Sequence, residues 1–281
     1  MATSQQKQEA LWGWFSQQKR KIAIAFSGGV DSSVLAKSAV LAFEQHFLSE
    51  LPLAILAVSP TVSSQEVQEA QQTAKEISIP LLIVPTDELN DRQFIKNDPQ
   101  RCYFCKKRRF SLLLRHLKSY DPPNDLDHSY ELLEGTNADD SEDYRPGYRA
   151  VQELKIISPF LDLKIKKSEI REWAIEWGLS VAQKPSNPCL ATRIAYGLKI
   201  NEERLRRIEK AESFLRSLHF NNFRVRMDSD LLARIEVPDD QFHSFAPKEI
   251  RNKIIKFFKE LNFQFISVDL EAFRSGKMNQ F

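Results

Sequence analysis

The chain has 281 residues, of which 42% are apolar and 28% are charged, and its formal net charge is +2. This composition is typical of a globular protein with one large or two modest domains, and the small net charge gives no indication of a nucleic-acid partner. No apolar run reaches the roughly 18–20 residues of a membrane span, so we predict no membrane partner. The first residues lack the layout of a secretory signal, and we therefore expect a cytoplasmic protein.

Along the first 195 residues, short apolar runs alternate with amphipathic segments. The apolar runs predict strands at 21–26, 53–58, 80–84, 130–134 and, more briefly, 155–158. The amphipathic segments predict helices at 4–19, 32–48, 64–77, 104–118 and 167–178, with a surface loop at 121–128. Strands that alternate with helices are typical of βαβ units. The sequence therefore predicts an α/β domain, a parallel sheet with helices on both faces.

The pattern changes near residue 195. Beyond this point the sequence predicts helices at 201–218 and 248–261 and strands at 223–227, 232–237 and 263–269. This order is typical of a small α+β domain. We therefore divide the chain into a domain at 1–195 and a domain at 196–281 that serves substrate binding or oligomerisation.

The first predicted strand ends in a glycine-containing loop, Ser27-Gly28-Gly29-Val30-Asp31-Ser32-Ser33, which leads into a helix. Glycines allow close approach of the backbone to a ligand, and N–H groups at a helix start attract anions. The loop lacks the GxxxxGK[ST] signature, so no P-loop lysine reaches between bound phosphates. A plain strand–helix turn with a Ser/Asp cap is the alternative interpretation.

The Ser-Gly-Gly-x-Asp-Ser order resembles the pyrophosphate loop, or PP-loop, of the ATP pyrophosphatases, which transfer AMP to a substrate and release pyrophosphate. The resemblance implies the PP-loop ATP pyrophosphatase fold, also called adenine nucleotide alpha hydrolase-like. It also implies that ATP contacts Ser27, Gly28, Gly29, Asp31, Ser32 and Ser33.

Polar segments follow two further predicted strands. Ser59 follows the second strand, at the place where PP-loop families commonly meet the adenine. Gly135, Thr136 and Asn137 follow the fourth strand, and ligands of open α/β sheets gather at such strand ends. An acidic run, residues 139–147, comes next and ends in a turn. Taken alone, each segment is better explained by capping and turn chemistry, but their joint placement after successive strands predicts an ATP site.

Oxygen-rich side chains at this site suggest a metal. Asp31 is a candidate ligand for Mg²⁺, because Mg²⁺ prefers oxygen ligands and often accompanies substrate phosphates.

The chain has three cysteines, which are too few for a disulfide framework. Cys102 and Cys105 form a CxxC pair directly before the basic helix at 104–118, and such a pair suits a redox dithiol, half a zinc site or an iron–sulfur cluster. The five histidines lack ligand spacing to this pair. Cys189 follows two prolines, Pro185 and Pro188, and Arg193 four residues later is a cation that can favour its thiolate. An inert buried cysteine is the alternative for Cys189.

Five separated segments together resemble the LarE family: residues 27–33, 134–137, 143–147, 188–193 and 273–279. The resemblance implies that ATP adenylates a carboxylate of pyridinium-3,5-biscarboxylic acid mononucleotide and that a sulfur nucleophile then displaces AMP. The product is a thiocarboxylate for the nickel-pincer nucleotide cofactor of lactate racemase. Cys189 takes the place of the family's sulfur-bearing cysteine, and the family's frequent hexamers imply a homo-oligomer.

The chain departs from the best-known members of this family, which carry one cysteine and sacrifice its sulfur. With Cys102 and Cys105 added, the chain resembles the three-cysteine branch, in which the thiolates hold a [4Fe-4S] cluster. Three thiolates leave one iron without a protein ligand, able to bind an added sulfide. We therefore expect delivery through a cluster held by Cys102, Cys105 and Cys189, with sacrifice of Cys189 as the alternative.

Other charged residues are candidates for substrate contact. Lys106 follows the CxxC pair and is a candidate for contact with ATP or the carboxylate, unless it is a solvated helix lysine. Arg224 and Arg226 lie two apart on a predicted strand, so both point to one side and suit a phosphate. The resemblance places the mononucleotide phosphate there; an exposed strand face is the alternative. The resemblance also marks two acidic positions near the substrate domain, Glu212 and Glu236.

Three other functions use some of the same features. A PP-loop tRNA thiolase also combines this loop with CxxC and a cluster, but it is expected to have a more basic surface. An amidating synthetase would not need three cysteines. A zinc- or cluster-binding module that only senses ATP would need no catalysis.

Overall fold

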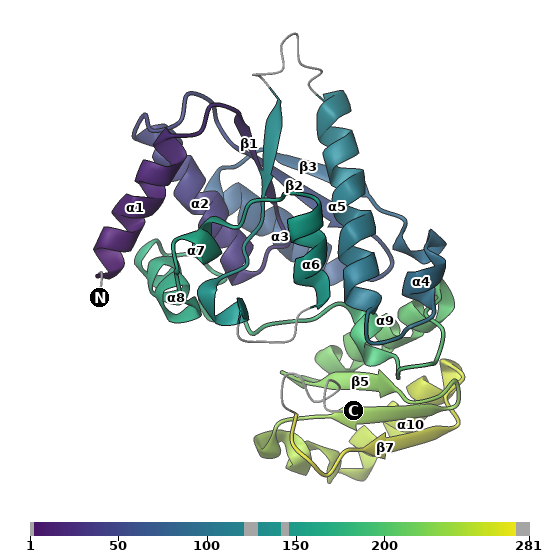
Figure 1. Ribbon diagram of the computed structural model, residues 1–281. Helices are drawn as coiled ribbons and strands as arrows, with labels where there is room; N and C mark the ends of the chain where they lie inside the picture. Colours follow the sequence, from purple (N-terminus) through teal and green to yellow (C-terminus); the bar gives the residue numbers. More distant parts are fainter. Residues whose placement is uncertain (1–2, 121–128, 142–145, 274–281) are drawn as a thin grey trace. The chain divides into compact units, whose positions relative to one another are not determined.

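The computed structural model describes residues 3–120, 129–141 and 146–273. The chain forms two compact units (Figure 1). Unit 1 contains Met1–Ser59, Ser64–Glu88 and Cys102–Lys184, and unit 2 contains Pro60–Ser63, Leu89–Arg101 and Pro185–Phe281. The loop predicted at 121–128 lies outside the described residues.

Unit 1 is built on a parallel four-stranded sheet in the order β3-β2-β1-β4. Its strands are β1 (Lys21–Ala25), β2 (Leu53–Val58), β3 (Leu81–Pro85) and β4 (Tyr130–Leu133). In the register, Ala23 of β1 faces Leu53 on one side and Leu132 on the other. These strands confirm the predicted parallel sheet. The order reverses at β1, and parallel sheets bind ligands at the carboxyl ends of the strands beside such a reversal.

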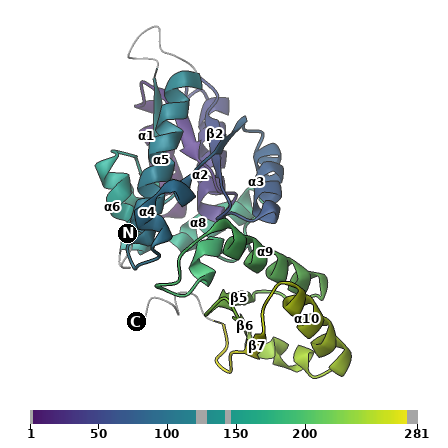
Figure 2. The same cartoon turned by 90° about the vertical axis from the view of Figure 1, so that its right-hand side faces the viewer.

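Helices cover both faces of this sheet, as predicted (Figures 1 and 2). Alternate strand residues serve the two faces, because side chains of a strand point to opposite sides. Ile22 and Ile24 join a core with α1 (Ser4–Ser16), α2 (Val30–Glu44), α3 (Ser64–Ile77), α7 (Pro159–Asp162) and α8 (Lys167–Glu176). Ala23 and Ile55 join a second core with α5 (Arg101–Tyr120) and α6 (Pro146–Glu153).

Three local predictions differ from the structure. The strand expected at 155–158 is reduced to one bridge between Leu133 and Ile157, because Lys155 has a φ of 55° and Ser158 already caps α7. The basic helix α5 begins at Arg101, so the CxxC pair lies inside its first turns. An Asp98-Pro99 start signal precedes it, and Asp98 Oδ1 accepts the N–H of Gln100 at 2.9 Å. Pro146 and Gly147 begin α6 instead of ending a loop.

Unit 2 contains a three-stranded sheet in the order β5-β6-β7, with β5 and β6 antiparallel and β6 and β7 parallel. The strands are β5 (Arg224–Met227), β6 (Leu232–Glu236) and β7 (Phe265–Val268). The longer helices are α9 (Glu202–Ser217) and α10 (Lys248–Glu260), and α4 (Arg92–Ile95) is a single turn. Phe214 of α9 stacks on Phe257 of α10 with ring centroids 4.1 Å apart. The predicted small α+β fold is confirmed.

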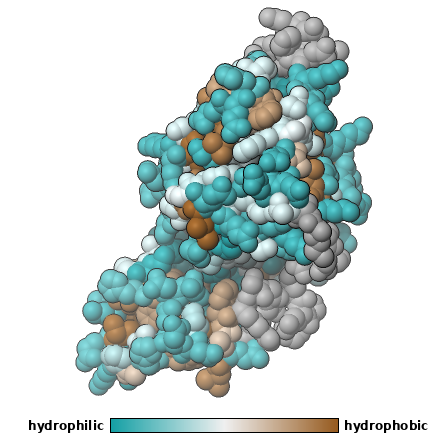
Figure 3. Space-filling view, turned by 90° about the vertical axis from the view of Figure 1, so that its left-hand side faces the viewer, coloured by the Kyte–Doolittle hydropathy of each residue, from teal (hydrophilic) through white to brown (hydrophobic). Residues whose placement is uncertain are grey.

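The surface is mostly polar on the face drawn in Figure 3, and its apolar side chains form separate groups. Among the described residues, no helix is both long enough and apolar enough to span a bilayer. The apolar sides of the helices are instead used in the cores described above.

Substitution of Trp173 of α8 tests the core that contains Ile22 and Ile24. Its ring is fully buried, lies edge-on to Phe160 at 6.3 Å, and donates its Nε1–H to Ser4 Oγ at 2.8 Å. We expect Trp173→Ala to lower the free energy of unfolding by about 3–5 kcal/mol, because it leaves a large cavity. Urea denaturation followed by circular dichroism measures the change.

The matched control is Ile175→Ala, on the same helix but 58% exposed, which we expect to change stability by no more than about 0.5 kcal/mol. Equal losses in the two variants would contradict this description of the core.

Candidate active site

The PP-loop (residues 27–33) forms the turn between β1 and α2. Gly28 has a φ of 66°, and a Cβ atom there would lie 2.6 Å from the backbone Cα of Ala70 on α3. The left-handed conformation and the lack of space both require glycine at this position. Ser32 closes the turn: its Oγ accepts the N–H of Ser27 at 3.2 Å and donates to the Gly29 carbonyl at 3.2 Å. The serines of the motif therefore brace the loop.

The segment that follows β4 packs against this loop. A Cβ atom on Gly135 would lie 3.1 Å from Asp31 Cβ and 3.1 Å from Ser32 N, so the two turns touch directly. Asn137 Nδ2 donates to Asp31 Oδ1 at 3.3 Å. The structure therefore brings the predicted residues after β1 and β4 together, at the reversal of strand order.

Glu134 organises the other side of the β4 loop (residues 134–137). Its carboxylate accepts the Thr136 N–H at 3.1 Å, the Thr136 hydroxyl at 2.8 Å and the Ser158 hydroxyl at 2.5 Å. Lys106 Nζ of α5 lies 3.6 Å from Glu134 Oε2 and is 38% exposed. Lys106 is therefore held beside the loop, while Thr136 is tied to Glu134.

A second titratable group, the half-buried Tyr148, lies close to Glu134. The pKa of Tyr148 on α6 is raised above its usual value by burial, and the charges of Asp162 and Glu134 add to this shift. Burial also raises the pKa of Asp162. The neighbourhood of the β4 loop therefore combines partly buried acids with the Lys106 cation.

Two of the residues predicted to contact ATP, Ser59 and Ser33, are buried. Ser59 directly follows β2 and is only 7% exposed. Ser33 is fully buried; its N–H is bonded to the Gly29 carbonyl at 3.0 Å, and its hydroxyl has no hydrogen-bond partner among the described residues. Ser33 therefore faces the core of the first turn of α2, away from solvent.

Two lysines that sequence reasoning did not assign reach the PP-loop. Lys167, the first residue of α8, forms an ion pair through Nζ with Asp31 Oδ2. Lys184 Nζ donates to the Gly28 carbonyl at 3.1 Å and pairs with Glu69 at 2.8 Å. Both lysines follow the loop by more than 130 residues, so no local pattern could reveal these contacts; a basic segment around Lys167 is the only signal in the sequence.

The three cysteines are divided between the units. Cys102 and Cys105 lie one turn apart on α5, with Lys106 four residues from Cys102 on the same side. Cys105 is buried and Cys102 exposed, whereas Cys189 of unit 2 precedes the 3-10 helix Leu190–Arg193. None of the three forms a disulfide.

The donor atoms fit the two predicted inorganic groups. Three thiols are the ligand type that iron–sulfur clusters take, and two of them share one helical turn. The Asp31 carboxylate provides oxygens of the kind that Mg²⁺ binds, whereas Asn137 faces it with its amide nitrogen. Within the described residues, no group of three or more His, Cys, Asp or Glu side chains is placed to hold a metal.

Arg193 holds the Cys189 loop from within. It is 1% exposed, and its Nε donates to Glu212 Oε1 at 3.0 Å. Its Nη atoms donate to the carbonyls of Pro188 and Cys189, the latter at 3.2 Å, and to Asn187 Oδ1 at 2.9 Å. Glu212 also accepts the N–H of Val225 at 3.1 Å, so this pair joins the loop to α9 and β5.

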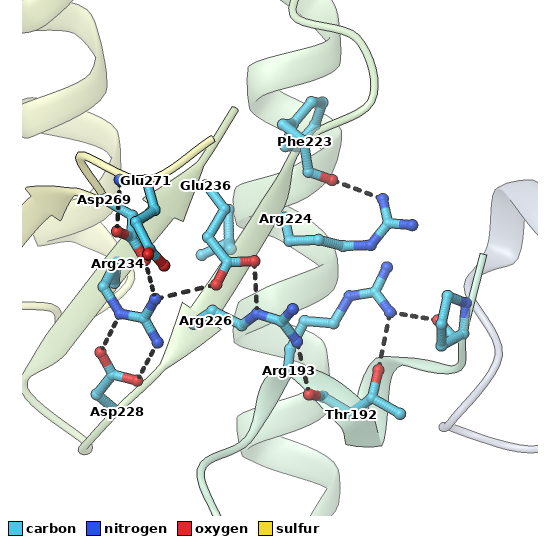
Figure 4. Close-up of polar contacts among 12 residues, drawn as sticks. Thr192, Arg193, Phe223, Arg224, Arg226, Asp228, Arg234, Glu236, Asp269 and Glu271 are labelled. Atoms are coloured by element: carbon cyan, nitrogen blue, oxygen red, sulfur yellow. Dashed lines mark hydrogen bonds and ion pairs between the residues drawn. The ribbon is translucent and has the colours of Figure 1, made fainter. Parts of the chain in front are cut away.

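Arg224 and Arg226 extend from β5 as predicted, but both are buried, which excludes the alternative of an exposed strand face (Figure 4). Arg226 donates to Glu236 Oε2 at 2.9 Å and to the Thr192 carbonyl at 2.9 Å. Burial lowers the pKa of Arg226, and Glu236 opposes that shift. Arg224 donates to the Phe223 carbonyl at 2.7 Å and the Ser186 carbonyl at 3.2 Å, with its guanidinium 4.7 Å from the Phe273 ring.

Arg234 of β6 continues this charged network (Figure 4). It donates to Glu236 Oε1 at 2.9 Å, to Asp228 Oδ2 at 2.8 Å and to Asp269 Oδ2 at 2.5 Å. The hydrogen bond with Asp228 is the main cause that raises the pKa of Arg234. Glu236 thus lies between two arginines, a role that its position in the sequence did not reveal.

The sequence of the chain is similar to those of several known proteins. No family model matches the sequence. An uncharacterized protein of Synechocystis is 36% identical over 274 residues, covering 98% of this chain and 97% of the relative. An uncharacterized protein of Methanocaldococcus jannaschii is 37% identical over 259 residues, covering 91% of this chain and 92% of the relative. The pyridinium-3,5-bisthiocarboxylic acid mononucleotide synthase of Lactiplantibacillus plantarum is 29% identical over 263 residues, covering 92% of this chain and 89% of that enzyme. The LarE family is the family that the chain resembles over nearly its whole length.

This similarity and the PP-loop motif indicate an ATP-using enzyme of the sulfur-transferase type. A more distant relative, the tRNA-specific 2-thiouridylase MnmA of Geobacter metallireducens, is 28% identical over 200 residues, covering 59% of this chain and 53% of that enzyme. Among solved structures, NMN synthetase from Francisella tularensis matches with a TM-score of 0.47 and 14% identity, covering 98% of this chain and 100% of that chain.

Part of the LarE-like motif set lies outside the described residues. Asp143, Tyr144 and Arg145 belong to the stretch 142–145, and the terminal motif after Phe273 belongs to 274–281. Asp139 and Asp140 are described and stabilise the β4 loop: Asp140 Oδ2 accepts the Asn137 N–H at 3.1 Å, and Asp139 Oδ2 accepts the Lys167 N–H at 2.8 Å.

Substitution of Arg193 tests whether its ion pair with Glu212 holds the Cys189 loop in place. We expect Arg193→Met to lower the free energy of unfolding by about 3–5 kcal/mol, because it leaves the Glu212 carboxylate buried without its cation. Arg193→Met combined with Glu212→Gln should recover much of this loss. Urea denaturation of the variants measures both effects.

The matched control is Arg206→Met, which removes an ion pair with Glu202 on the same helix as Glu212, but with side chains 68% and 51% exposed. We expect a change below about 1 kcal/mol there. An Arg193 variant as stable as this control would contradict a structural role for the buried pair.

Proposed function

We propose that the protein adenylates a carboxylate of pyridinium-3,5-biscarboxylic acid mononucleotide with ATP, releases pyrophosphate and converts the acyl-adenylate to a thiocarboxylate. The product would serve the nickel-pincer nucleotide cofactor of lactate racemase. The observation that carries the proposal is the direct contact between the PP-loop and the β4 loop in a chain related to a pyridinium-3,5-bisthiocarboxylic acid mononucleotide synthase.

Unit 1 would perform the activation. The backbone N–H groups of the PP-loop and the start of α2 would bind the ATP phosphates, as helix N-termini do with anions. Asp31, positioned by the Asn137 amide, would hold Mg²⁺, which neutralises phosphate charge when bound. Lys106, beside the β4 loop, would contact ATP or the carboxylate and orient it for attack on the α-phosphorus.

Sulfur transfer would follow in a step that needs no change of oxidation state. A sulfur nucleophile adds to the acyl carbon, the new C–S bond replaces the C–O bond to AMP, and AMP leaves with the electron pair. Cys102, Cys105 and Cys189 would hold a [4Fe-4S] cluster that supplies the sulfide when loaded. The support for this choice is the number of thiols, since a sacrificial route needs Cys189 alone.

Arg224 and Arg226 are the proposed ligands for the substrate phosphate. Their guanidiniums lie on one strand and are buried in a network that also contains Arg193 and Arg234. Arginine forks match phosphate geometry, and both guanidiniums come from the same strand. A homo-oligomeric state and a cytoplasmic location stay predictions from the sequence.

A PP-loop tRNA thiolase is the second candidate, favoured by the similarity to MnmA. That similarity covers a smaller share of both chains than the similarity to the mononucleotide synthase. The net charge of +2 also gives little attraction for RNA. We therefore place the small mononucleotide first.

Activation can be separated from sulfur transfer by one pair of proteins. We expect the wild type to release pyrophosphate from ATP in the presence of the dicarboxylate mononucleotide and to form a thiocarboxylate, detected by mass spectrometry. Cys189→Ser should still release pyrophosphate, because the ATP site lies in unit 1, but should form no thiocarboxylate.

Two outcomes would contradict this function. Pyrophosphate release that requires tRNA would favour the thiolase. Absence of release with any carboxylate would favour an ATP-sensing module.

The sulfur source can be tested by metal analysis after anaerobic purification. We expect about four irons and four sulfides per chain, as in a [4Fe-4S] cluster, and their loss in Cys102→Ser. A colourless protein with one equivalent of zinc would contradict the cluster. A wild-type chain that loses one sulfur at Cys189 after turnover, measured by intact mass, would favour sacrifice instead.

A further inference from the structure

The PP-loop carries no lysine of its own, yet a leaving pyrophosphate benefits from a nearby cation. Lys167 and Lys184 both reach the loop from later parts of unit 1. Lys184 binds a backbone carbonyl of the loop and Glu69. Lys167 instead pairs with Asp31, the carboxylate of the loop motif itself.

The Asp31 carboxylate is divided between two partners. Its Oδ1 accepts from Asn137 Nδ2 at 3.3 Å, and its Oδ2 pairs with Lys167 Nζ. The side chains of Asp31 and Lys167 are 29% and 31% exposed, so solvent and solutes reach them. A divalent cation on these oxygens would repel the ammonium group, because both carry positive charge. Lys167 and Mg²⁺ therefore compete for one carboxylate.

The backbone of Lys167 is fixed, whereas its ammonium can move. Its N–H donates to Asp139 Oδ2 at 2.8 Å, and α8 is anchored by the ion pair of Lys7 with Glu169 at 2.8 Å. A lysine has a flexible four-carbon stem and three donors, so the ammonium can leave Asp31 while the helix stays in place.

We propose that Lys167 is a phosphate-binding residue of the ATP site, held in reserve by Asp31. When Mg²⁺ binds Asp31, the Lys167 ammonium is released and binds the pyrophosphate part of ATP. This inference rests on the proposed use of ATP with release of pyrophosphate, and it adds the cation that the loop sequence lacks.

Binding measurements on the full chain test the exchange. The probes are Mn²⁺ alone, as a substitute for Mg²⁺, and inorganic pyrophosphate alone, each titrated by calorimetry. We expect Lys167→Met to bind Mn²⁺ about threefold more tightly, because a competing surface ion pair is removed. We expect it to bind pyrophosphate at least about tenfold more weakly, because a charge-assisted hydrogen bond is lost. Lys167→Arg keeps the charge and should retain pyrophosphate binding within about threefold.

Two controls accompany the variants. Lys21→Met removes a lysine ion pair with Glu50 at the start of β1, the end of the strand away from the PP-loop, and should change neither affinity. Asp31→Asn combined with Lys167→Met should abolish the gain in Mn²⁺ affinity. If the methionine variant does not fold, Lys167→Gln gives the same comparison.

An unchanged Mn²⁺ affinity or an unchanged pyrophosphate affinity in Lys167→Met overturns the proposal. These assays contain no carboxylate substrate, so they hold whether or not the protein forms a thiocarboxylate. A failure of the proposed function in turnover and a failure of the exchange in binding are therefore distinguishable.

Discussion

The close approach of backbone segments at the carboxyl ends of β1 and β4 is the constraint on which the nucleotide end of unit 1 depends. Gly28 touches α3, and Gly135 touches the first turn of α2, with no room for a Cβ at the first and little at the second. The sheet order makes β1 and β4 neighbours, and the two turns then meet across that boundary. The hydrogen bond from Asn137 to Asp31 crosses between the two turns at this contact.

The two units use positive charge in different ways. In unit 1, Lys106, Lys167 and Lys184 are partly exposed. Their ion pairs therefore contribute little free energy, and a ligand can replace them. In unit 2, Arg193 and Arg226 are buried with carboxylates, and removal of one partner leaves an uncompensated charge in the interior. Exchange is therefore a property of the lysines, whereas the arginines stabilise a fixed geometry.

The parts of the fold that depend on local pattern were predictable. Apolar runs located all four strands of the large sheet, and the glycine loop after β1 located the first binding turn. Long-range contacts were not predictable: Lys167 meets Asp31 across more than 130 residues, and Glu236 meets Arg226 through strand pairing. Local conflicts also misled the pattern, since Lys155 with positive φ ends a segment that reads as a strand. The cysteine pair lies inside a helix because α5 begins at Arg101, directly after the turn in which Asp98 accepts the N–H of Gln100 and ahead of the apolar periodicity that located the helix.

The buried Arg193 has a consequence for the proposed sulfur transfer, because it limits the motion of the loop that carries Cys189. By binding the carbonyls of Pro188 and Cys189, it removes most of the backbone freedom that a loop with two prolines retains. A thiol on such a loop has little conformational entropy left to lose when it meets a partner. Its reactivity is then governed by the arrival of that partner, because the waiting group is already confined to a narrow range of orientations.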